Sequence, residues 1–263
     1  MAKVEKIGVG VEIDPSAQFV DVEQLEIGDH SYIGPNVRII GGQFRVGEYS
    51  KIHSNCYMYP KNGIRLGHCT WIGQGTHLDG TGGISAGDFL GVGINSALYS
   101  HIRHGDVTEG CTLDKDGFLH IGSDVWFVGM CLVSPVTAAD KSVALLGSTI
   151  TKPMEMNHVY GGSPAVDLTH RMGAPWRERT VDEKIVLVET AVNHFFGEVR
   201  QDLDRSAIVV GTRMSRFEVG QTLYDVASRT YTKTNSEIEV ALNRWLFGYR
   251  AKFRPASQVV TND

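Results

Sequence analysis

The sequence predicts an all-β left-handed parallel β-helix of hexapeptide repeats, followed by a C-terminal α+β extension. Three observations support this prediction. An aliphatic residue followed by glycine recurs from Ile7-Gly8 to Ile121-Gly122, apolar residues continue from each such pair in steps of six, and a small side chain usually stands four residues after each apolar one. A period of six fits neither the two-residue alternation of an open sheet nor the 3.6-residue period of a helix.

Each set of three six-residue steps defines one coil of about 20 residues with three short flat faces. The apolar residue of each step fills the interior of a three-sided prism, and seven coils stack so that each one hydrogen-bonds to its neighbours. The expected interior positions are Ile7, Ile13, Phe19, Ile27, Ile33, Ile39, Val46, Ile52, Met58, Leu66, Ile72, Leu78, Ala86, Val92, Leu98, Ile121, Phe127, Val133, Ala138, Ala144 and Ile150.

The small side chains are expected to fit where the chain turns a corner of the prism, with Gly or Asn nearby adopting unusual backbone angles. Two cysteines belong to this column, and we expect them to be corner fillers rather than reactive thiols. The column comprises Ser31, Val37, Ser50, Cys56, Thr70, Thr76, Ser96, Val125, Cys131, Ser142 and Ser148.

The repeat is expected to form a β-helix domain over residues 1–170. Its rhythm fails once, between Leu98 and Ile121, and the chain is expected to leave the prism there as an excursion loop over residues 99–120. Loops carried by a rigid scaffold are common positions for functional residues. This loop is therefore the first place to look for chemistry.

After Pro175 the six-residue pattern ends, and residues 176–263 are expected to form a small α+β appendage. A capping box at Thr180–Glu183 opens one helix, and a second capping box at Ser236–Glu239 opens another that runs to about Tyr249. The strands expected between these helices are Ser206–Val210 and one or two within Phe217–Thr234, divided at Gly220.

Composition and charge narrow the classes of function. Hydrophobic residues make up 42% of the 263 residues and charged residues 21%, so the chain is globular rather than disordered. The net charge of −5 shows no basic excess that would favour nucleic acid or an anionic membrane as partner. No apolar run approaches the roughly 20 residues of a membrane span, and the N-terminal segment lacks the apolar core of a signal peptide, so a cytoplasmic location is expected. None of the four cysteines is in CxxC spacing, so neither a metal site nor a disulfide framework is expected.

The segment Ile121–Leu168 carries motifs that point to a known family. It contains Asp124-Val125-Trp126, a turn at Pro135, a Thr151-Lys152 pair and a closing Gly162-Ser163-Pro164-Ala165. In this order the motifs resemble the terminal segment of the hexapeptide-repeat acyltransferases, a family that includes maltose, galactoside and serine acetyltransferases and sugar N-acyltransferases. The resemblance covers about residues 7–170.

The resemblance implies an enzyme that moves an acetyl or other acyl group from acyl-coenzyme A to a hydroxyl or amine of a sugar or nucleotide sugar. It also implies a homotrimer in which the site forms where a loop of one chain meets a neighbouring chain. Acyl transfer needs a base for the acceptor's proton, donors for the developing oxyanion and a means of holding both substrates together.

In the related acetyltransferases a loop histidine is the base, and the excursion loop carries two candidates, His101 and His104. A neutral imidazole accepts a proton at neutral pH because its ordinary pKa is about 6.5. Leu98–Ser100 matches the start of the family's loop motif, and His104–Asp106 matches its end with one extra residue, whereas His101 is expected closer to the flat face of the prism. The sequence leaves the choice between the two histidines open.

Asp79 is the third catalytic candidate. With a coil of about 20 residues it is expected one rung from Tyr99, beside the exit of the loop. Its carboxylate either orients a catalytic histidine or binds the acceptor. The alternative is a corner aspartate that accepts hydrogen bonds from backbone amides.

The resemblance also implies where the coenzyme binds. The pantetheine arm of acyl-coenzyme A is expected along the C-terminal coils, where Gly129 and Gly147 stand. Lys152, with Thr151 beside it, is expected to meet the nucleotide phosphates, and Arg171 adds positive charge.

Bulky residues stand where the family has small ones. Leu145–Gly147 replaces Gly-Ala-Gly, and Val128–Met130 replaces a small pair. These residues are expected to narrow or move the pantetheine channel, which leaves open an unusual acyl thioester as donor or a non-catalytic binding or assembly protein. A zinc lyase of the carbonic anhydrase type is a further alternative, but it needs three histidines around the metal, and His53, His68 and His77 occupy non-equivalent coil positions.

Overall fold

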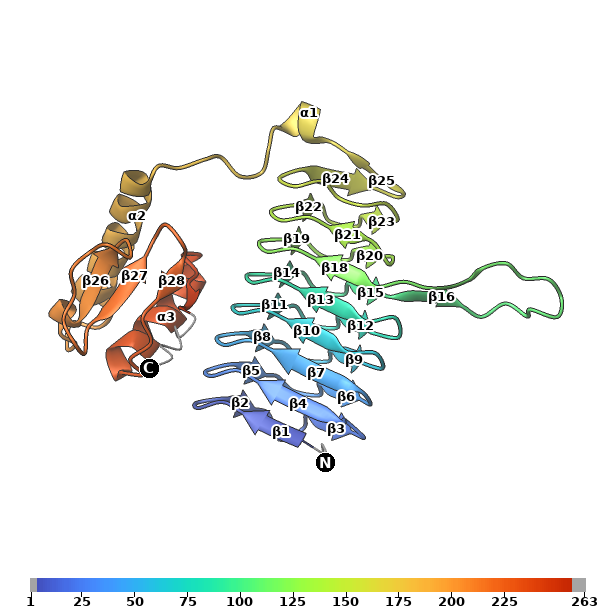
Figure 1. The fold of residues 1–263 in the computed structure, drawn as a ribbon, viewed down its shortest axis with the longest axis horizontal. Helices are drawn as coiled ribbons and strands as arrows, with labels where there is room; N and C mark the ends of the chain where they lie inside the picture. The colour runs from blue at the N-terminus through green and yellow to red at the C-terminus, as the bar shows by residue number, and fades with distance from the viewer. Residues whose placement is uncertain (1–3, 257–263) are drawn as a thin grey trace, which may run out of the picture. The chain divides into compact units, whose positions relative to one another are not determined.

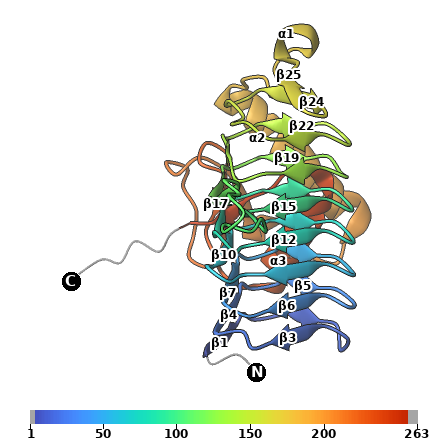
Figure 2. The ribbon, with the colours of Figure 1, turned by 90° about the vertical axis from the view of Figure 1, so that its right-hand side faces the viewer.

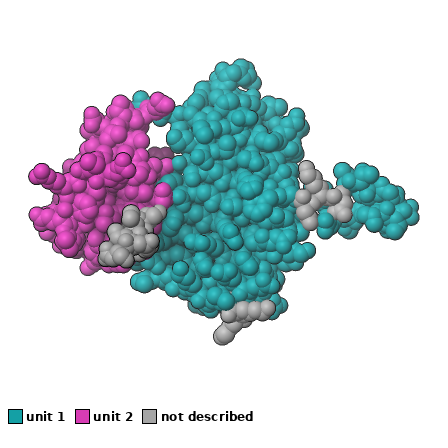
Figure 3. Space-filling view, viewed as in Figure 1, with its two compact units in different colours: residues 1–177 teal, residues 178–263 magenta. Residues whose placement is uncertain are grey.

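The computed structural model describes residues 4–256, except for the side chains of residues 114–116. The chain divides into two compact units, residues 1–177 and residues 178–263 (Figure 3). Each unit is described by itself.

The first unit winds through three parallel sheets in turn, so that each coil adds one strand to each sheet (Figure 1). Sheet A contains β1 (Val4–Ile7), β4 (Gln24–Ile27), β7 (Gln43–Val46), β10 (Ile64–Leu66), β13 (Ile84–Ala86), β18 (Leu119–Ile121) and β21 (Thr137–Ala138). Sheet B contains β2 (Glu12–Ile13), β5 (Tyr32–Ile33), β8 (Lys51–Ile52), β11 (Trp71–Ile72), β14 (Gly91–Val92), β19 (Trp126–Phe127), β22 (Val143–Ala144), β24 (Val159–Gly162) and β25 (Ala165–Asp167). Sheet C contains β3 (Gln18–Val20), β6 (Arg38–Ile40), β9 (Tyr57–Tyr59), β12 (His77–Asp79), β15 (Ala97–Tyr99), β20 (Leu132–Val133) and β23 (Thr149–Ile150).

The pairing registers confirm the predicted coil. Ile7 pairs with Ile27 and Ile27 pairs with Val46, so equivalent residues of the first coils are 20 or 19 positions apart, whereas Ile121 and Ala138 in the last two complete coils are 17 apart. All seven predicted triplets of interior residues occupy equivalent positions in the seven coils that residues 4–150 complete, and from the second coil onward they share one continuous apolar core. The fold is a left-handed parallel β-helix.

The corners of the prism explain both the glycines and the small residues. A Cβ on Gly28 would lie 2.5 Å from the backbone nitrogen of Glu48 in the next coil, so the position after the aliphatic residue has no room for a side chain. All eleven small residues of the predicted corner column are buried. Cys56 and Cys131 are confirmed as corner fillers; burial raises the pKa of the Cys56 thiol to about 11.

The two ends of the prism differ. Ile7 and Ile13 in the first coil are 38% and 36% exposed, because no coil among the described residues stacks beneath them. At the other end, Met154 and Tyr160 continue the six-residue step into an eighth, incomplete coil that the seven predicted coils do not include. Strand β25 then folds back antiparallel on β24, and the short helix α1 (Thr169–Met172) follows.

The excursion leaves the prism as a hairpin. Strands β16 (His101–Arg103) and β17 (Asp114–Asp116) pair antiparallel, and Figure 1 shows the hairpin extending away from the stack of coils. Figure 2 faces this hairpin and shows β3, β6, β12 and β15 of sheet C stacked beside it. The chain re-enters the prism at β18, where Ala86 pairs with Ile121.

The second unit combines helices with a four-stranded mixed sheet. Helix α2 (Val181–His194) continues into a π-helical turn (Phe195–Val199), and a 3₁₀ turn (Arg205–Ala207) precedes the sheet. The sheet order is β26 (Ile208–Gly211), β27 (Thr222–Asp225), β28 (Thr230–Tyr231) and β29 (Arg254–Pro255), with α3 (Glu237–Tyr249) between the last two strands in sequence. No helix among the described residues of either unit is both long and apolar enough to cross a bilayer.

Two local predictions for this unit need correction. The capping box at Thr180–Glu183 is confirmed, but the second is only half formed: the Ser236 hydroxyl accepts from the Glu239 N–H (3.2 Å), while the Glu239 carboxylate accepts from Asn235 and Thr234 instead. The strands within Phe217–Thr234 are divided by the turn between β27 and β28 and not at Gly220, which precedes both.

Candidate functional site

Two of the catalytic candidates, His101 and Asp79, and two of the coenzyme candidates, Thr151 and Lys152, lie along one edge of the prism. This edge, which we call the C–A corner, is where each coil passes from sheet C to sheet A. Asp79 pairs with Tyr99, and the pairing of Leu98, Val133 and Ile150 places Ser134 and Thr151 next in the same row. Neighbouring strands are about 4.8 Å apart, so the coil that carries Thr151 lies about 10 Å from the coil that carries Tyr99.

The root of the hairpin is held against Asp79. Ser100 is fully buried, its hydroxyl donates to the carbonyl of Asp79 (2.7 Å), and it accepts from the Gly82 N–H (2.8 Å). On the return strand, the Gly117 N–H donates to the carbonyl of Ser100 (3.0 Å). These bonds fix the position at which the next residue, His101, begins β16.

His101 and Asp79 form a close pair. Nδ1 of His101 lies 3.2 Å from Oδ1 of Asp79, and the two side chains are 24% and 13% exposed. The contact has the length of an ion pair without the alignment of a hydrogen bond, and the same carboxylate oxygen accepts from the Thr81 N–H (2.9 Å). Asp79 therefore caps a corner turn and also faces an imidazole, and its role in catalysis stays a prediction.

The second histidine lies in a different setting. His104 is exposed on the hairpin beyond β16. Nearby, the Asp106 carboxylate accepts from the Thr108 N–H (2.8 Å) and hydroxyl (2.6 Å), and these bonds hold the pKa of Asp106 below its usual value. The Asp106 carboxylate, two residues after His104, is thus engaged within the hairpin, whereas the Asp79 carboxylate faces the ring of His101.

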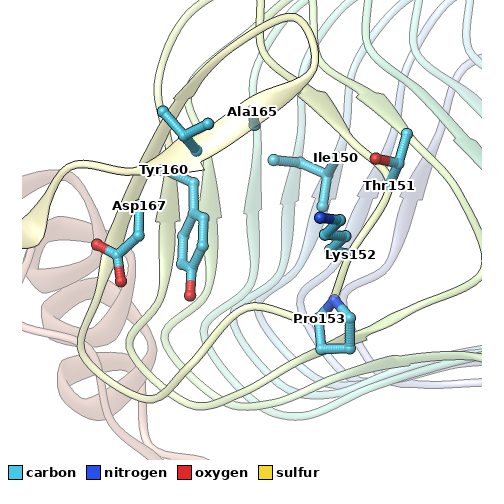
Figure 4. Close-up of a pocket in the computed structure, with 8 residues that line it drawn as sticks. Ile150, Thr151, Lys152, Pro153, Tyr160, Ala165 and Asp167 are labelled. Atoms are coloured by element: carbon cyan, nitrogen blue, oxygen red, sulfur yellow. The ribbon is translucent and has the colours of Figure 1, made fainter.

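A pocket of about 270 Å³ lies at the last coil of the C–A corner. Thr151 and Lys152 line it, together with Tyr160 and the β25 residues Ala165–Asp167 (Figure 4). In Figure 4, the Tyr160 ring lies between the Asp167 carboxylate and the Lys152 side chain. The pocket therefore offers an amine and a hydroxyl at one side and a carboxylate at the other.

The polar groups on the β25 side of the pocket are partly engaged. The Tyr160 hydroxyl accepts from the Glu155 N–H (2.9 Å), and burial raises the pKa of Tyr160. Asp167 accepts from Thr169 N–H (2.7 Å) and lies 2.6 Å from His158 Nδ1, and these bonds lower its pKa to about 2. Tyr160 and Asp167 were not among the predicted site residues; the six-residue step from Met154 to Tyr160 was the signal for the first.

The remaining coenzyme candidates lie elsewhere. Gly129 and Gly147 stand at the opposite end of the sheet C strands, where the coils pass from sheet B to sheet C, and the Gly147 N–H donates to the carbonyl of Gly129 (2.9 Å). Leu146 is 63% exposed there, and a Cβ on Gly129 would come within 3.3 Å of its Cδ1. Arg171 is exposed on α1. The structure thus brings Lys152 and Thr151 together but not with the two glycines, and a narrowed pantetheine path stays a prediction.

A second, larger groove of about 560 Å³ runs along the A–B corner, where the first coils pass from sheet A to sheet B. Here the polar side chains serve the neighbouring coil. His68 Nδ1 accepts from the Glu48 N–H (3.1 Å), Asp88 accepts from the His68 N–H (2.8 Å), and Asp29 accepts from the Val9 N–H (2.8 Å). This ladder of side-chain caps was not predicted from the sequence. It shows that these polar and charged side chains satisfy backbone N–H groups of neighbouring coils.

The histidines of the coils are dispersed. His68 belongs to the ladder at the A–B corner, His53 packs against Trp71 on sheet B (ring centroids 5.0 Å), and His77 packs against Tyr57 on sheet C (4.8 Å). Within the described part of the chain, no three His, Cys, Asp or Glu side chains gather as a group that could hold a metal ion.

Comparison with known proteins adds three likenesses. No family model matches the chain. A hexapeptide-repeat acetyltransferase of Vibrio cholerae O1 biovar eltor, complexed with acetyl-coenzyme A, is 20% identical over 54% of this chain and 69% of its own, with a TM-score of 0.39. The N-acyltransferase AntD of Bacillus cereus, in complex with dTDP and 3-hydroxybutyryl-CoA, is 17% identical over 70% of this chain and 86% of its own (TM-score 0.41). A maltose O-acetyltransferase of Clostridium difficile 630 is 16% identical over 64% and 66% (TM-score 0.30). The fold assignment rests on the strand order of this chain itself.

Proposed function

We propose that the protein is an acyltransferase that moves an acetyl or other acyl group from acyl-coenzyme A to a hydroxyl or amine of a sugar or nucleotide-sugar-like acceptor. The observation that carries the proposal is the pairing of His101 with Asp79 on the same corner as the Lys152 pocket, about two coils away. The motif order in Ile121–Leu168, which resembles the hexapeptide-repeat acyltransferases, supports the same conclusion.

His101 is the proposed general base. With Nδ1 facing the Asp79 carboxylate, the tautomer that carries its proton on Nδ1 is favoured, which leaves Nε2 as the acceptor of a proton. The acceptor's O–H or N–H proton passes to Nε2 as its oxygen or nitrogen bonds to the thioester carbonyl. The C–S bond then breaks, and the imidazolium returns the proton to the leaving thiolate. A positioned base of this kind typically contributes about 10²–10⁴-fold in rate.

Asp79 is the proposed positioning residue. Its carboxylate lies 3.2 Å from Nδ1 and stabilises the positive charge that forms on the imidazole during transfer. Because Asp79 also closes a backbone turn with Thr81, its own position is fixed by the corner. The pair is therefore built on the rigid coils rather than on the hairpin tip.

The Lys152 pocket is the proposed anchor of the donor. The Lys152 amine is exposed at a pocket mouth and supplies positive charge for the coenzyme's phosphates, with the Thr151 hydroxyl beside it. An arm that extends from this pocket along the C–A corner leads to His101. The donor thus enters from the last coil, and the thioester is placed at the root of the hairpin.

The direct test is a thiol-release assay with purified protein, acetyl-coenzyme A and a panel of sugar and nucleotide-sugar acceptors. Acceptor-dependent release of coenzyme A thiol is expected, and isothermal titration of coenzyme A should show one site per chain. Absence of both turnover and coenzyme binding across acetyl and longer acyl donors would contradict the proposal.

The alternative of a non-catalytic binding or assembly protein is favoured by one observation. Leu146 lies over Gly129, on the path that the resemblance implies for the pantetheine arm and that the proposed route along the C–A corner does not use. Under this alternative coenzyme A does not bind, and a Leu146→Ala variant does not restore binding. Under the proposed function, that variant binds coenzyme A at least as tightly as the wild type.

A homotrimer is part of the proposal. The hairpin extends from the coils (Figure 1). Val107 and Leu113 are exposed on it, so it has apolar surface to place against a neighbouring chain. Two paired strands without further partners are of marginal stability in water, which favours such a contact. Light scattering of the native protein should give three times the mass of one chain.

A further inference from the structure

A row of aromatic rings on the outer face of sheet C ends at the candidate base. The rings of Tyr57 and His77 lie 4.8 Å apart, those of His77 and Tyr99 are stacked at 5.5 Å with an interplanar angle of 29°, and Tyr99 meets the edge of His101 at 6.2 Å. These residues come from β9, β12, β15 and β16, so the row crosses successive coils.

The register shows how the row forms. His77 pairs with Tyr57 on one side and with Ala97 on the other. Because the side chain of Ala97 is small, it leaves space beside His77 on the face of sheet C. The ring of Tyr99, two residues further along the strand, occupies this space and stacks on the imidazole. Tyr99 remains 39% exposed, and the other two rings are half-buried. The ring faces are therefore held in place by one another while part of their surface stays open.

The row lies on one side of His101 and the donor pocket on the other. Tyr57 and His77 belong to the third and fourth coils, whereas Lys152 belongs to the seventh. If the donor reaches His101 from the later coils, the acceptor must approach from the earlier coils or from outside the prism. The aromatic row is a surface of the earlier coils that adjoins the His101–Asp79 pair, with Tyr59 paired to Asp79 beside it.

The neutral character of the row also bears on its ligand. Burial holds the pKa of His77 below its usual value, against the opposing effect of Asp79. At neutral pH the row thus presents a partly exposed, uncharged aromatic surface, which suits a ring of a pyranose or a nucleobase better than a phosphate group.

We propose that Tyr57, His77 and Tyr99 form the acceptor subsite and bind the acceptor by stacking against a flat ring, either the sugar itself or the base of a nucleotide sugar. This inference rests on the proposed function, because it assumes that the acceptor must reach His101.

The chain contains a matched control for the proposal. On sheet B, Tyr32, His53 and Trp71 form a similar row, with ring centroids 6.1 and 5.0 Å apart. That row lies on a different face of the prism and does not include a residue of the excursion. If stacked rings serve only to hold neighbouring coils together, changes to the two rows should have the same consequences.

The test compares Tyr57→Leu, Tyr57→Phe and Trp71→Leu. Tyr57→Leu is expected to raise the KM for the acceptor by about tenfold, because one stacking surface is lost, while the KM for acetyl-coenzyme A is unchanged. Tyr57→Phe keeps the ring and should retain the wild-type acceptor KM, and Trp71→Leu should retain it as well. An unchanged acceptor KM in Tyr57→Leu, or an equal rise in Trp71→Leu, would overturn the proposal.

A binding measurement separates this inference from the proposed function. Saturation-transfer NMR with thymidine and with methyl α-D-glucopyranoside needs no turnover and tells which kind of ring binds. Signal from either probe that is lost in Tyr57→Leu and kept in Tyr57→Phe supports the subsite even if the protein transfers no acyl group. The opposite result is turnover that depends on His101, with no signal from either probe and an unaltered acceptor KM in Tyr57→Leu. It would support the proposed function and contradict the acceptor subsite. A change of oligomeric mass in Tyr57→Leu at unaltered acceptor KM would assign the row to a subunit contact and also overturn the inference.

Discussion

The A–B corner and the C–A corner both stack polar side chains coil upon coil, but they direct them to different partners. At the A–B corner His68 accepts a hydrogen bond from the backbone of the preceding coil. At the C–A corner the ring nitrogen of His101 instead faces the carboxylate of Asp79, and the Lys152 amine lies at a pocket. In a solenoid, every coil must satisfy its corner amides, so a polar residue at a corner is ordinarily structural. His101 and Lys152 therefore remain available for chemistry at the C–A corner, whereas Asp79 both caps the turn at Thr81 and faces the imidazole.

The largest expected effect comes from replacing the proposed base. His101→Ala should lower kcat by about 10²–10⁴-fold, because the acceptor's proton loses its positioned acceptor, while the melting temperature stays that of the wild type. Thiol release and thermal unfolding measure the two quantities. His104→Ala is the matched variant on the same hairpin and should retain most of the activity. Loss of turnover in His104→Ala alone would transfer the role of base to the outer histidine.

Asp79→Asn tests the positioning role separately from the corner turn. Asparagine keeps an oxygen that accepts from the Thr81 N–H but removes the charge that faces His101. The expected result is a fall in kcat of about tenfold or more with little change in stability. Equal kcat in both proteins would reduce Asp79 to a corner cap like those of the A–B corner.

Lys152→Ala should weaken donor binding. Removing the amine is expected to raise the KM for acyl-coenzyme A by about tenfold, the scale of one charge-assisted contact, with kcat nearly unchanged. Lys61→Ala is the matched control, because Lys61 is an exposed lysine at the same corner in the third coil. Calorimetric titration with coenzyme A provides the affinities, and equal losses in the two variants would remove the special role of Lys152.

His68→Ala should show the reverse pattern of His101→Ala. The Glu48 N–H loses its acceptor at the A–B corner, and the free energy of unfolding should fall by about 1–2 kcal/mol. Urea unfolding measures this change, and the thiol-release rate should stay at the wild-type value. A His68→Ala protein with intact stability and impaired turnover would invalidate the distinction between the two corners.

The smallest expected effect concerns Asp167, a carboxylate that is bound on two sides. Its hydrogen bonds with Thr169 and His158 lower its pKa to about 2 in the folded protein, from 3.8 in the unfolded chain. The charged carboxylate therefore stabilises the fold at pH values above the unfolded pKa. This contribution to stability is lost as the pH falls toward and through the pKa of Asp167 in the folded protein. Asp167→Asn should therefore lower stability more at about pH 6 than at about pH 3, as measured by urea unfolding. A difference that does not vary with pH would show that the charge of Asp167 does not contribute.

The extent of the repeat shows how far periodicity can be followed in the sequence. Seven coils were predicted because each contributes three apolar residues in register, and the incomplete eighth coil was missed because it contributes only Met154 and Tyr160. The second capping box failed for a related reason. Glu239 has the right spacing from Ser236, but its carboxylate is buried and accepts hydrogen bonds from Thr234 and Asn235 instead. Spacing identifies a possible partner, whereas burial decides which partner is taken.

The sequence by itself determined the three-sided coil, the number of complete turns and the place where the chain leaves them. It could do so because every coil repeats the same local requirements, an apolar side chain inside, no Cβ beside the next coil's backbone and a small side chain at the corner. Only the tertiary structure decided that His101 faces the Asp79 carboxylate while His104 lies exposed on the hairpin, and that Lys152 shares the corner of Asp79 while Gly129 does not. Those contacts depend on the strand register and on the path by which the hairpin leaves the coil. Both bring together residues that are not separated by a multiple of the repeat, so periodicity in the sequence does not reveal them.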